Sequence, residues 1–156
     1  MPLAGERVKA SHLDFPITQV RAAAATAITP TATWTNVVFD TEDFDDDAMH
    51  LASGSGIVAQ RAGRYELSGG IGFAANATGR RGARWTVNNT AVDGSEVIVM
   101  TTSSLTCSIS VRTVVVELAV GDTVRLQGYQ ESGGSLNTST TGETQPSALV
   151  RFLGEG

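Results

Sequence analysis

The chain turns and enters a strand at Ala62-Gly63-Arg64-Tyr65-Glu66-Leu67, and it repeats this pattern at Leu118-Ala119-Val120-Gly121-Asp122-Thr123-Val124-Arg125-Leu126. In each stretch a glycine, which tolerates the backbone angles of a tight turn, precedes a run in which apolar and polar residues alternate. Further short alternating runs, separated by turn residues, lie before, between and after these two. Many short strands at near-regular intervals predict an all-β fold, an antiparallel β-sandwich or jelly roll.

The best alternation in the chain follows the first of these turns. Tyr65, Leu67, Ile71 and Phe73 share one face of the strand predicted over residues 64–75. These four residues are predicted to belong to the core or to a trimer interface. The opposite face carries mostly small residues, which indicates that another backbone approaches it closely.

A change of phase marks the strand expected over residues 105–118. Apolar residues hold the odd positions up to Val111 and the even positions from Val114 onward. One extra residue shifts the alternation in this way, so the pattern predicts a β-bulge. Trp34 and Trp85 fall within strand patterns and are predicted to lie in the core. The other expected segments are strands over 34–39, 57–60, 83–87, 97–101, 124–129 and 148–153, a long surface loop over 131–146, and a first strand over 20–29, where the alanines also permit a helix.

Length and composition point to one globular domain. The 156 residues suffice to bury a core, and only 17% of them are charged. The net charge of −5 argues against nucleic-acid binding, because phosphate recognition needs a concentrated basic surface. The basic cluster of Arg80, Arg81 and Arg84 is interpreted as a solvated or subunit-facing patch. A single cysteine, Cys107, excludes an intrachain disulfide, and no stretch reaches membrane-spanning length.

Residues 1–20 differ in character from the rest. Two prolines interrupt them, and they show neither alternation nor a helical stripe. Apolar anchors without periodicity predict an arm that becomes ordered against a partner surface, although a flexible terminus is the alternative. We therefore divide the chain into a docking arm over 1–20 and a sandwich domain over 21–156. The candidate docking residues are Leu3, Val8, Leu13, Phe15 and Ile17.

Carboxylates are densest in residues 41–50, a segment predicted to form an acidic loop. The spacing of Asp43, Asp45 and Asp47 is similar to that of a calcium-binding loop. However, the twelfth position, which would supply a bidentate glutamate, is Gly54, and the mid-loop glycine is missing as well. A solvated loop is the favoured interpretation, and we predict neither a metal nor a cofactor.

The sequence contains no arrangement typical of a catalytic site. His12 and His50 lie in different regions, His50 is expected at the surface, and no spacing suggests a Ser-His-Asp triad. The glycine-rich segment 69–72 lies within a strand pattern and not at a strand-to-helix turn, which argues against a phosphate-binding loop. We therefore expect a non-enzymatic protein.

Five features occur in a fixed order along residues 34–153. They are the triplet Asp43-Phe44-Asp45, the strand opening Ala62-Gly63-Arg64-Tyr65, the Asn88-Asn89 turn, the Leu-x-x-Gly-Asp-x-Val unit at 118–124, and an apolar last strand. In this order and spacing they resemble the C1q/TNF-like jelly roll. The resemblance implies a tight homotrimer.

The opening residues Met1-Pro2-Leu3-Ala4-Gly5-Glu6-Arg7-Val8 look like the start of small structural proteins of tailed phages. This similarity implies a virion component, a capsid decoration or a tail-associated knob, which is made in the host cytoplasm without a signal peptide and is attached through its arm to other virion proteins. The alternative is an adhesion module whose loops recognise a glycan or protein of the host surface. Neither nucleic acid nor a membrane is an expected partner.

Overall fold

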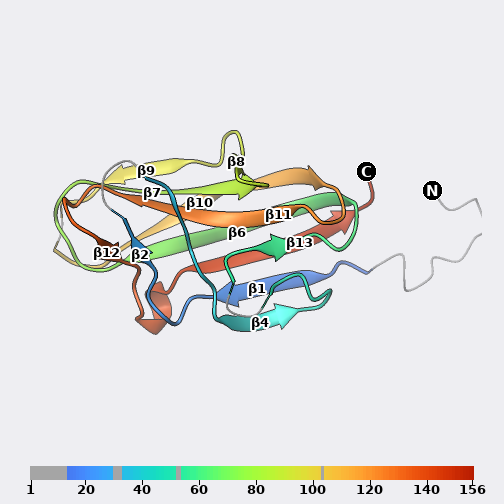
Figure 1. Ribbon diagram of the computed structural model, residues 1–156, viewed down its shortest axis with the longest axis horizontal. Helices are drawn as coiled ribbons and strands as arrows, with labels where there is room; N and C mark the ends of the chain where they lie inside the picture. The colour runs from blue at the N-terminus through green and yellow to red at the C-terminus, as the bar shows by residue number, and fades with distance from the viewer. Residues whose placement is uncertain (1–13, 30–32, 52–53, 103) are drawn as a thin grey trace, which may run out of the picture.

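The computed structural model describes residues 14–29, 33–51, 54–102 and 104–156, which form two antiparallel sheets packed as a sandwich (Figure 1). The first, called here the β6 sheet, contains in spatial order β10 (Cys107–Leu118), β6 (Gly63–Phe73), β13 (Ser147–Gly154), β1 (Ile17–Arg21) and β4 (Thr41–Asp45). The second, the β7 sheet, contains β3 (Thr35–Asn36), β11 (Thr123–Gln130), β7 (Arg80–Val87) and β8 (Thr90–Ala91), with β5 (Ile57–Val58) beside β11 and β9 (Val97–Met100) beside β7. Two short strands, β2 (Ala27–Ile28) and β12 (Leu136–Asn137), pair with each other, and a 3-10 helix, η2, spans Gly142–Thr144. The predicted all-β sandwich is confirmed.

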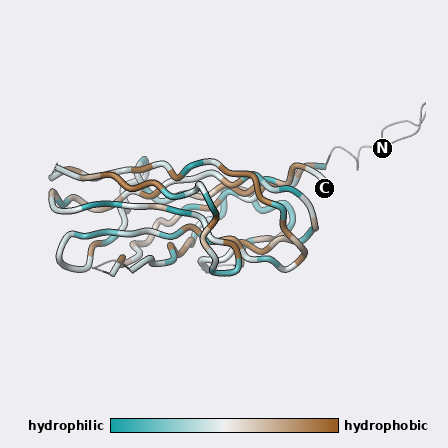
Figure 2. Tube along the Cα trace, turned by 90° about the horizontal axis from the view of Figure 1, so that it is seen from above, coloured by the Kyte–Doolittle hydropathy of each residue, from teal (hydrophilic) through white to brown (hydrophobic). Residues whose placement is uncertain are grey.

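The core lies between the two sheets, where the chain runs in two layers (Figure 2). Tyr65, Leu67, Ile71 and Phe73 all point into it and are at most 1% exposed. The alternating face of β6 is therefore the core of the single chain. Trp85 of β7, also fully buried, contributes to the same core from the opposite layer.

The predicted bulge is present. The register between β10 and β6 shifts between Val111 and Val114, so that Val111 pairs with Gly69 and Val114 pairs with Leu67. Because the extra residue restores the inward phase, apolar side chains on both sides of the bulge face the core. The Asn88-Asn89 turn is confirmed as well, since both residues have the positive φ angles (50° and 68°) that tight hairpin turns need.

The small residues on the other face of β6 do meet another backbone, as predicted. A Cβ atom on Gly72 would lie 1.8 Å from the carbonyl oxygen of Thr144 in η2, whereas one on Gly70 would lie 2.8 Å from that of Ile109 in the neighbouring strand β10. Both of these backbones belong to the same chain. The loop over 131–146 thus packs η2 onto β6, and its Leu136 is buried in the core, contrary to the expectation of a loop without core residues.

The boundary of the predicted arm needs correction. Ile17 begins β1, which lies between β13 and β4 inside the β6 sheet, so residues 17–20 belong to the sandwich. Phe15 precedes this strand and is 49% exposed. The remaining candidate docking residues, Leu3, Val8 and Leu13, lie outside the described residues.

Two further expectations are wrong in part. The alanine-rich segment forms neither one strand nor a helix after Arg21, because the carboxylate of Asp40 accepts hydrogen bonds from the backbone N–H groups of Ala23 and Ala24 and holds them in a loop. The acidic segment begins as a strand, β4, and not as a loop. An edge strand pairs on one side only, so charged side chains can remain in water.

Candidate functional site

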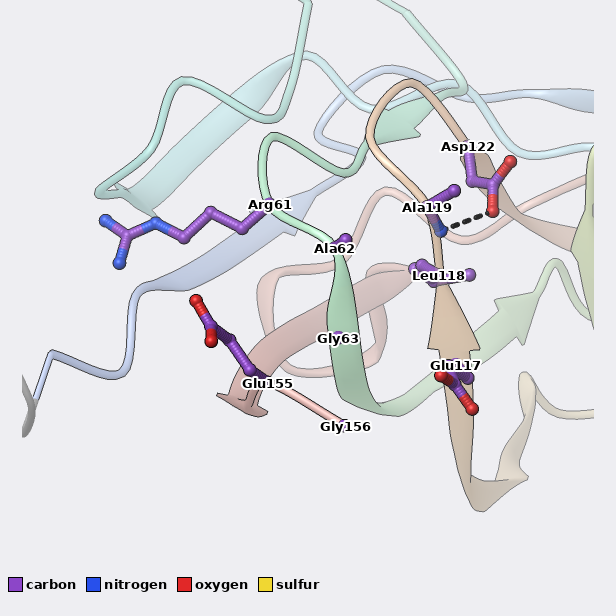
Figure 3. Close-up of a pocket in the computed structure, with 9 residues that line it drawn as sticks. All are labelled: Arg61, Ala62, Gly63, Glu117, Leu118, Ala119, Asp122, Glu155 and Gly156. Carbon is purple, nitrogen blue, oxygen red and sulfur yellow. Dashed lines mark hydrogen bonds between the residues drawn. The ribbon is translucent and has the colours of Figure 1, made fainter. Parts of the chain in front are cut away.

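A pocket of about 800 Å³ opens at one end of the sandwich, where the turn before β6 lies beside the turn before β11 (Figure 3). Its lining comes from the turn before β6, the end of β10, the turn before β11 and the last residues of the chain. The nine lining residues are Arg61, Ala62, Gly63, Glu117, Leu118, Ala119, Asp122, Glu155 and Gly156.

The acidic groups of this pocket do not converge on one point. Asp122 accepts hydrogen bonds from Asn88 Nδ2 and from the backbone N–H of Ala119, both at 2.8 Å. These two bonds, that of Asn88 first, lower the pKa of Asp122 and identify it as a turn-stabilising group. Figure 3 shows the carboxyl groups of Glu117, Asp122 and Glu155 pointing in different directions. Among the described residues, no histidine, cysteine or hydroxyl side chain lines the pocket.

The carboxylates of the acidic segment are each bound to a different protein group. Asp43 pairs with Arg21 at 2.8 Å, and this hydrogen-bonded pair lowers the pKa of Asp43. Asp45 accepts a hydrogen bond of 2.7 Å from the hydroxyl of Thr18. Asp47 pairs with Arg61 at 2.8 Å. The alternate residues thus serve as ties between β4, β1 and the turn before β6, and the described part of the chain holds no cluster of three or more metal-ligating side chains.

His50 is buried, contrary to the expectation of a surface residue. Its Nδ1 lies 2.8 Å from Glu42 Oε1, and its Nε2 lies 3.1 Å from the carbonyl oxygen of Gly54. The edge of its ring faces Phe39, with ring centroids 6.4 Å apart. The imidazole therefore ties β4 to the loop before β5 and, with no exposed side-chain surface, cannot reach a substrate. His12 lies outside the described residues.

The basic cluster separates into three environments. Arg80 is exposed and pairs with Glu131 at 2.7 Å, as expected of a solvated residue. Arg81, on the opposite face of β7, is fully buried, which contradicts the prediction, and its guanidinium donates to the carbonyl oxygens of Asn76, Thr78 and Arg80. Arg84 lies on the outer face of the β7 sheet. Strand alternation thus separates neighbours that the sequence places in one cluster.

The outer face of the β7 sheet carries a candidate binding surface that sequence reasoning missed. Trp34, predicted as core, is partly exposed there, just before β3. Its ring centroid is 5.2 Å from that of Tyr129, and the guanidinium carbon of Arg84 lies 4.2 Å from its centroid. Gly82 leaves room for the indole, since a Cβ there would lie 3.1 Å from the Trp34 ring. The sequence does contain a sign of this surface. Arg80, Gly82 and Arg84 occupy alternate positions of β7 and so share the face on which Trp34 lies.

Comparison with solved structures identifies the fold. The globular domain of zebrafish complement 1qA superposes with a TM-score of 0.62 at 14% identity, covering 90% of this chain and 99% of that one. Murine APRIL gives 0.67 at 13% identity, with 89% and 100% covered. Eiger TNF from S. frugiperda gives 0.61 at 12% identity, with 91% and 94% covered. This chain has the C1q/TNF-like jelly-roll fold.

The superposition covers about nine tenths of this chain and nearly all of each of these two domains. At 12–14% identity the comparison establishes the fold, which the sequence resemblance predicted. No protein-family model matches the chain, and no curated protein matches it. Among the described residues, no helix is both long and apolar enough to cross a bilayer.

Proposed function

We propose that the protein is a non-enzymatic assembly module that acts as a homotrimer. The observation that carries this proposal is the outer face of the β6 sheet, where short side chains surround the shallow hollow lined by Gly70, Ser108, Ser110 and Ser147. The short side chains around this hollow let a second copy of the chain approach closely, although Glu66 and Arg151, which pair with each other at 3.0 Å, lie on the same face. Homotrimers are also what the resemblance to the C1q/TNF-like jelly roll implies, and obligate interfaces of this kind bury about 2,000 Å² or more.

The oligomeric state tests this proposal directly. Light scattering over a dilution series should give about three times the chain mass of 16.2 kDa. Val115→Arg places a long cation on the outer face of β10, opposite Glu66, and should shift the mass toward the monomer. Val120→Arg, in the turn after β10, is the matched control, because Val120 is 66% exposed and Val115 is 57% exposed. A monomer mass at every concentration would refute the proposal.

We further propose that this module is a structural component of a tailed-phage virion, a capsid decoration or a tail-associated knob. The similarity of Met1–Val8 to the opening of such proteins supports this role, as do the apolar residues that precede β1. Phe15 lies beside a hollow of about 250 Å³ that it forms with Arg151, Phe152 and Leu153, and this hollow offers a docking position for a neighbouring virion protein.

Particle incorporation tests the virion role. A chain that begins at residue 15 keeps β1 and its pairing with β13, so it should fold and keep its oligomeric mass. It should no longer co-sediment with phage particles, whereas the full-length chain should. Equal incorporation of the two would show that the first 14 residues are not the anchor.

The second candidate is an adhesion module that binds a host-surface glycan. It is favoured by one observation, the partly exposed Trp34 on the outer face of the β7 sheet. The two roles are compatible, because assembly would use the β6 sheet and recognition the β7 sheet.

A further inference from the structure

A row of three polar side chains crosses the outer face of the β7 sheet. Asn36 of β3 is the register partner of Gln127 in β11, and Gln127 is the register partner of Arg84 in β7. Arg84 Nε donates to Gln127 Oε1 at 2.9 Å, and Gln127 Nε2 donates to Asn36 Oδ1 at 2.9 Å. The three residues and the indole of Trp34 are called here the Arg84 surface.

The direction of these hydrogen bonds is fixed by chemistry. A guanidinium can only donate, so Gln127 must turn its carbonyl oxygen toward Arg84 and its amide nitrogen toward Asn36. Asn36 must then present its carbonyl oxygen to Gln127. Both amide oxygens are therefore used within the row, while the terminal nitrogens of Arg84 and the amide nitrogen of Asn36 have no hydrogen-bond acceptor among the described residues. The row consequently presents donors to solvent.

Arg84 belongs, with Arg64, Arg81, Arg112 and Arg125, to the described arginines that have no ion-pair partner among the described residues. Arg21, Arg61, Arg80 and Arg151 each contact a carboxylate at 3.0 Å or less. Arg84 has no such contact in the part of the chain that the structure describes, although the charge of Glu96 acts on it from beyond ion-pair distance. Burial lowers the pKa of Arg84, with Glu96 opposing that effect.

The guanidinium of Arg84 is held in place without a counter-charge. The guanidinium carbon lies over the Trp34 ring and Gln127 binds Nε, so the remaining N–H groups are positioned before any ligand arrives. Arg125, two residues from Gln127 on the same face of β11, adds a second cation and donates to Asn89 Oδ1 at 3.2 Å. Preorganised donors cost little entropy on binding, and a planar guanidinium matches a carboxylate through two parallel hydrogen bonds.

We propose that the Arg84 surface binds a carboxylate-bearing sugar, such as a uronic acid unit of a surface glycan. The carboxylate takes the two terminal nitrogens of Arg84, and the amide nitrogen of Asn36 donates to a neighbouring sugar oxygen. The partly exposed indole of Trp34 gives the C–H groups of the sugar ring an apolar contact, since an aromatic face carries partial negative charge. This site deepens the second candidate function and is independent of trimer formation.

Titration of the full-length protein with an oligosaccharide of alternating glucuronate and N-acetylglucosamine tests the proposal. Chitohexaose, which carries N-acetylglucosamine without the carboxylate, is the neutral comparison. We expect saturable binding of the acidic sugar, at least tenfold weaker binding of the neutral one, and a change in tryptophan fluorescence from Trp34, because Trp85 is fully buried.

Variants localise the binding. Arg84→Gln should weaken binding of the acidic sugar about tenfold or more, and Arg112→Gln, an exposed arginine on β10 in the other sheet, should leave it unchanged. Asn36→Asp keeps an acceptor for Gln127 but replaces the free donor with a negative charge, so it should abolish binding of the acidic sugar. An unchanged melting temperature of this variant would show that the fold is kept.

Three outcomes would overturn the proposal. These are no binding of the acidic sugar at millimolar concentration, binding that Arg84→Gln and Asn36→Asp leave intact, and equal Arg84-dependent binding of a polyglutamate peptide. The last result would assign the surface to a protein carboxylate. Light scattering on the same samples reports the oligomeric mass separately, so loss of sugar binding does not affect the test of the homotrimer.

Discussion

Replacement of Gly72 by alanine perturbs the contact between η2 and the outer face of β6. The new Cβ atom would lie 1.8 Å from the carbonyl oxygen of Thr144 and 2.9 Å from its carbonyl carbon. Carbon and oxygen atoms in contact lie about 3.5 Å apart, so the η2 backbone must move away by about 1.7 Å. Both atoms belong to the backbone, and no side-chain rotation can relieve the overlap.

The expected cost follows from two opposing effects. Overpacking of this kind costs about 1–3 kcal/mol, whereas alanine in a strand gains roughly 0.5–1 kcal/mol over glycine through its lower chain entropy. The net loss should be about 1–2 kcal/mol, which for a domain of this size lowers the melting temperature by roughly 2–8 °C. Unfolding in urea, at one fixed protein concentration, measures the free energy.

Gly134→Ala is the matched control. Gly134 lies in the same loop region, and a Cβ atom there would meet no atom within 4 Å. Its free energy of unfolding should stay within about 0.5 kcal/mol of that of the parent protein. Limited proteolysis at Glu143 in η2 should become faster in Gly72→Ala alone. Equal stability of the two variants, with equal proteolysis, would refute the packing of η2 on β6.

Three other substitutions probe interior and surface pairs. Arg81→Met leaves three carbonyl oxygens without their buried donor and should lower the free energy of unfolding, measured in urea, by about 3 kcal/mol. An unchanged free energy would show that these carbonyl groups do not need the guanidinium. Glu131→Gln removes the partner of Arg80, which with Tyr129 lowers the pKa of Glu131 to about 2. That folded-state pKa lies below the value of 4.5 for the free group, so the carboxylate stabilises the fold. The difference in melting temperature between the parent protein and the variant should be complete above pH 4.5 and should vanish as the pH falls to about 2. Thermal melts across this range measure it. His50→Ala removes the ring that contacts Glu42 and a backbone carbonyl and opens a cavity, so it should lower the free energy of unfolding by about 3 kcal/mol; a change below about 0.5 kcal/mol would show that His50 does not stabilise the fold.

Local patterns in the sequence predicted those features that depend on side-chain alternation alone. The phase change between Val111 and Val114 located the bulge, because a one-residue shift alters the inward face wherever the strand pairs. The alternation over 65–73 located the core for the same reason. The order of the turn motifs then led to the jelly roll, which the solved structures confirm.

Features that depend on distant partners were missed. The acidic residues of β4 resemble a loop because their pairing strand, β1, lies more than 20 residues earlier in the chain. The interior position of Arg81 depends on carbonyl groups of the loop before β7, which a sequence pattern cannot place. Trp34 was assigned to the core because alternation defines two faces of a strand without showing which face is covered. β3 is also only two residues long, so the alternation around Trp34 is short.

The described chain enters and leaves the sandwich at the same end. Asp14 contacts Arg61 at 2.8 Å, and both Arg61 and Gly156 line the pocket of Figure 3. β11 runs away from this pocket, from Thr123 to Gln130, and the exposed Gly133 and Gly134 follow at the opposite end, with no atom near either missing Cβ. A peptide inserted at Gly133 or Gly134 would therefore meet no steric obstacle and would project from the end of the sandwich opposite to both ends of the described chain.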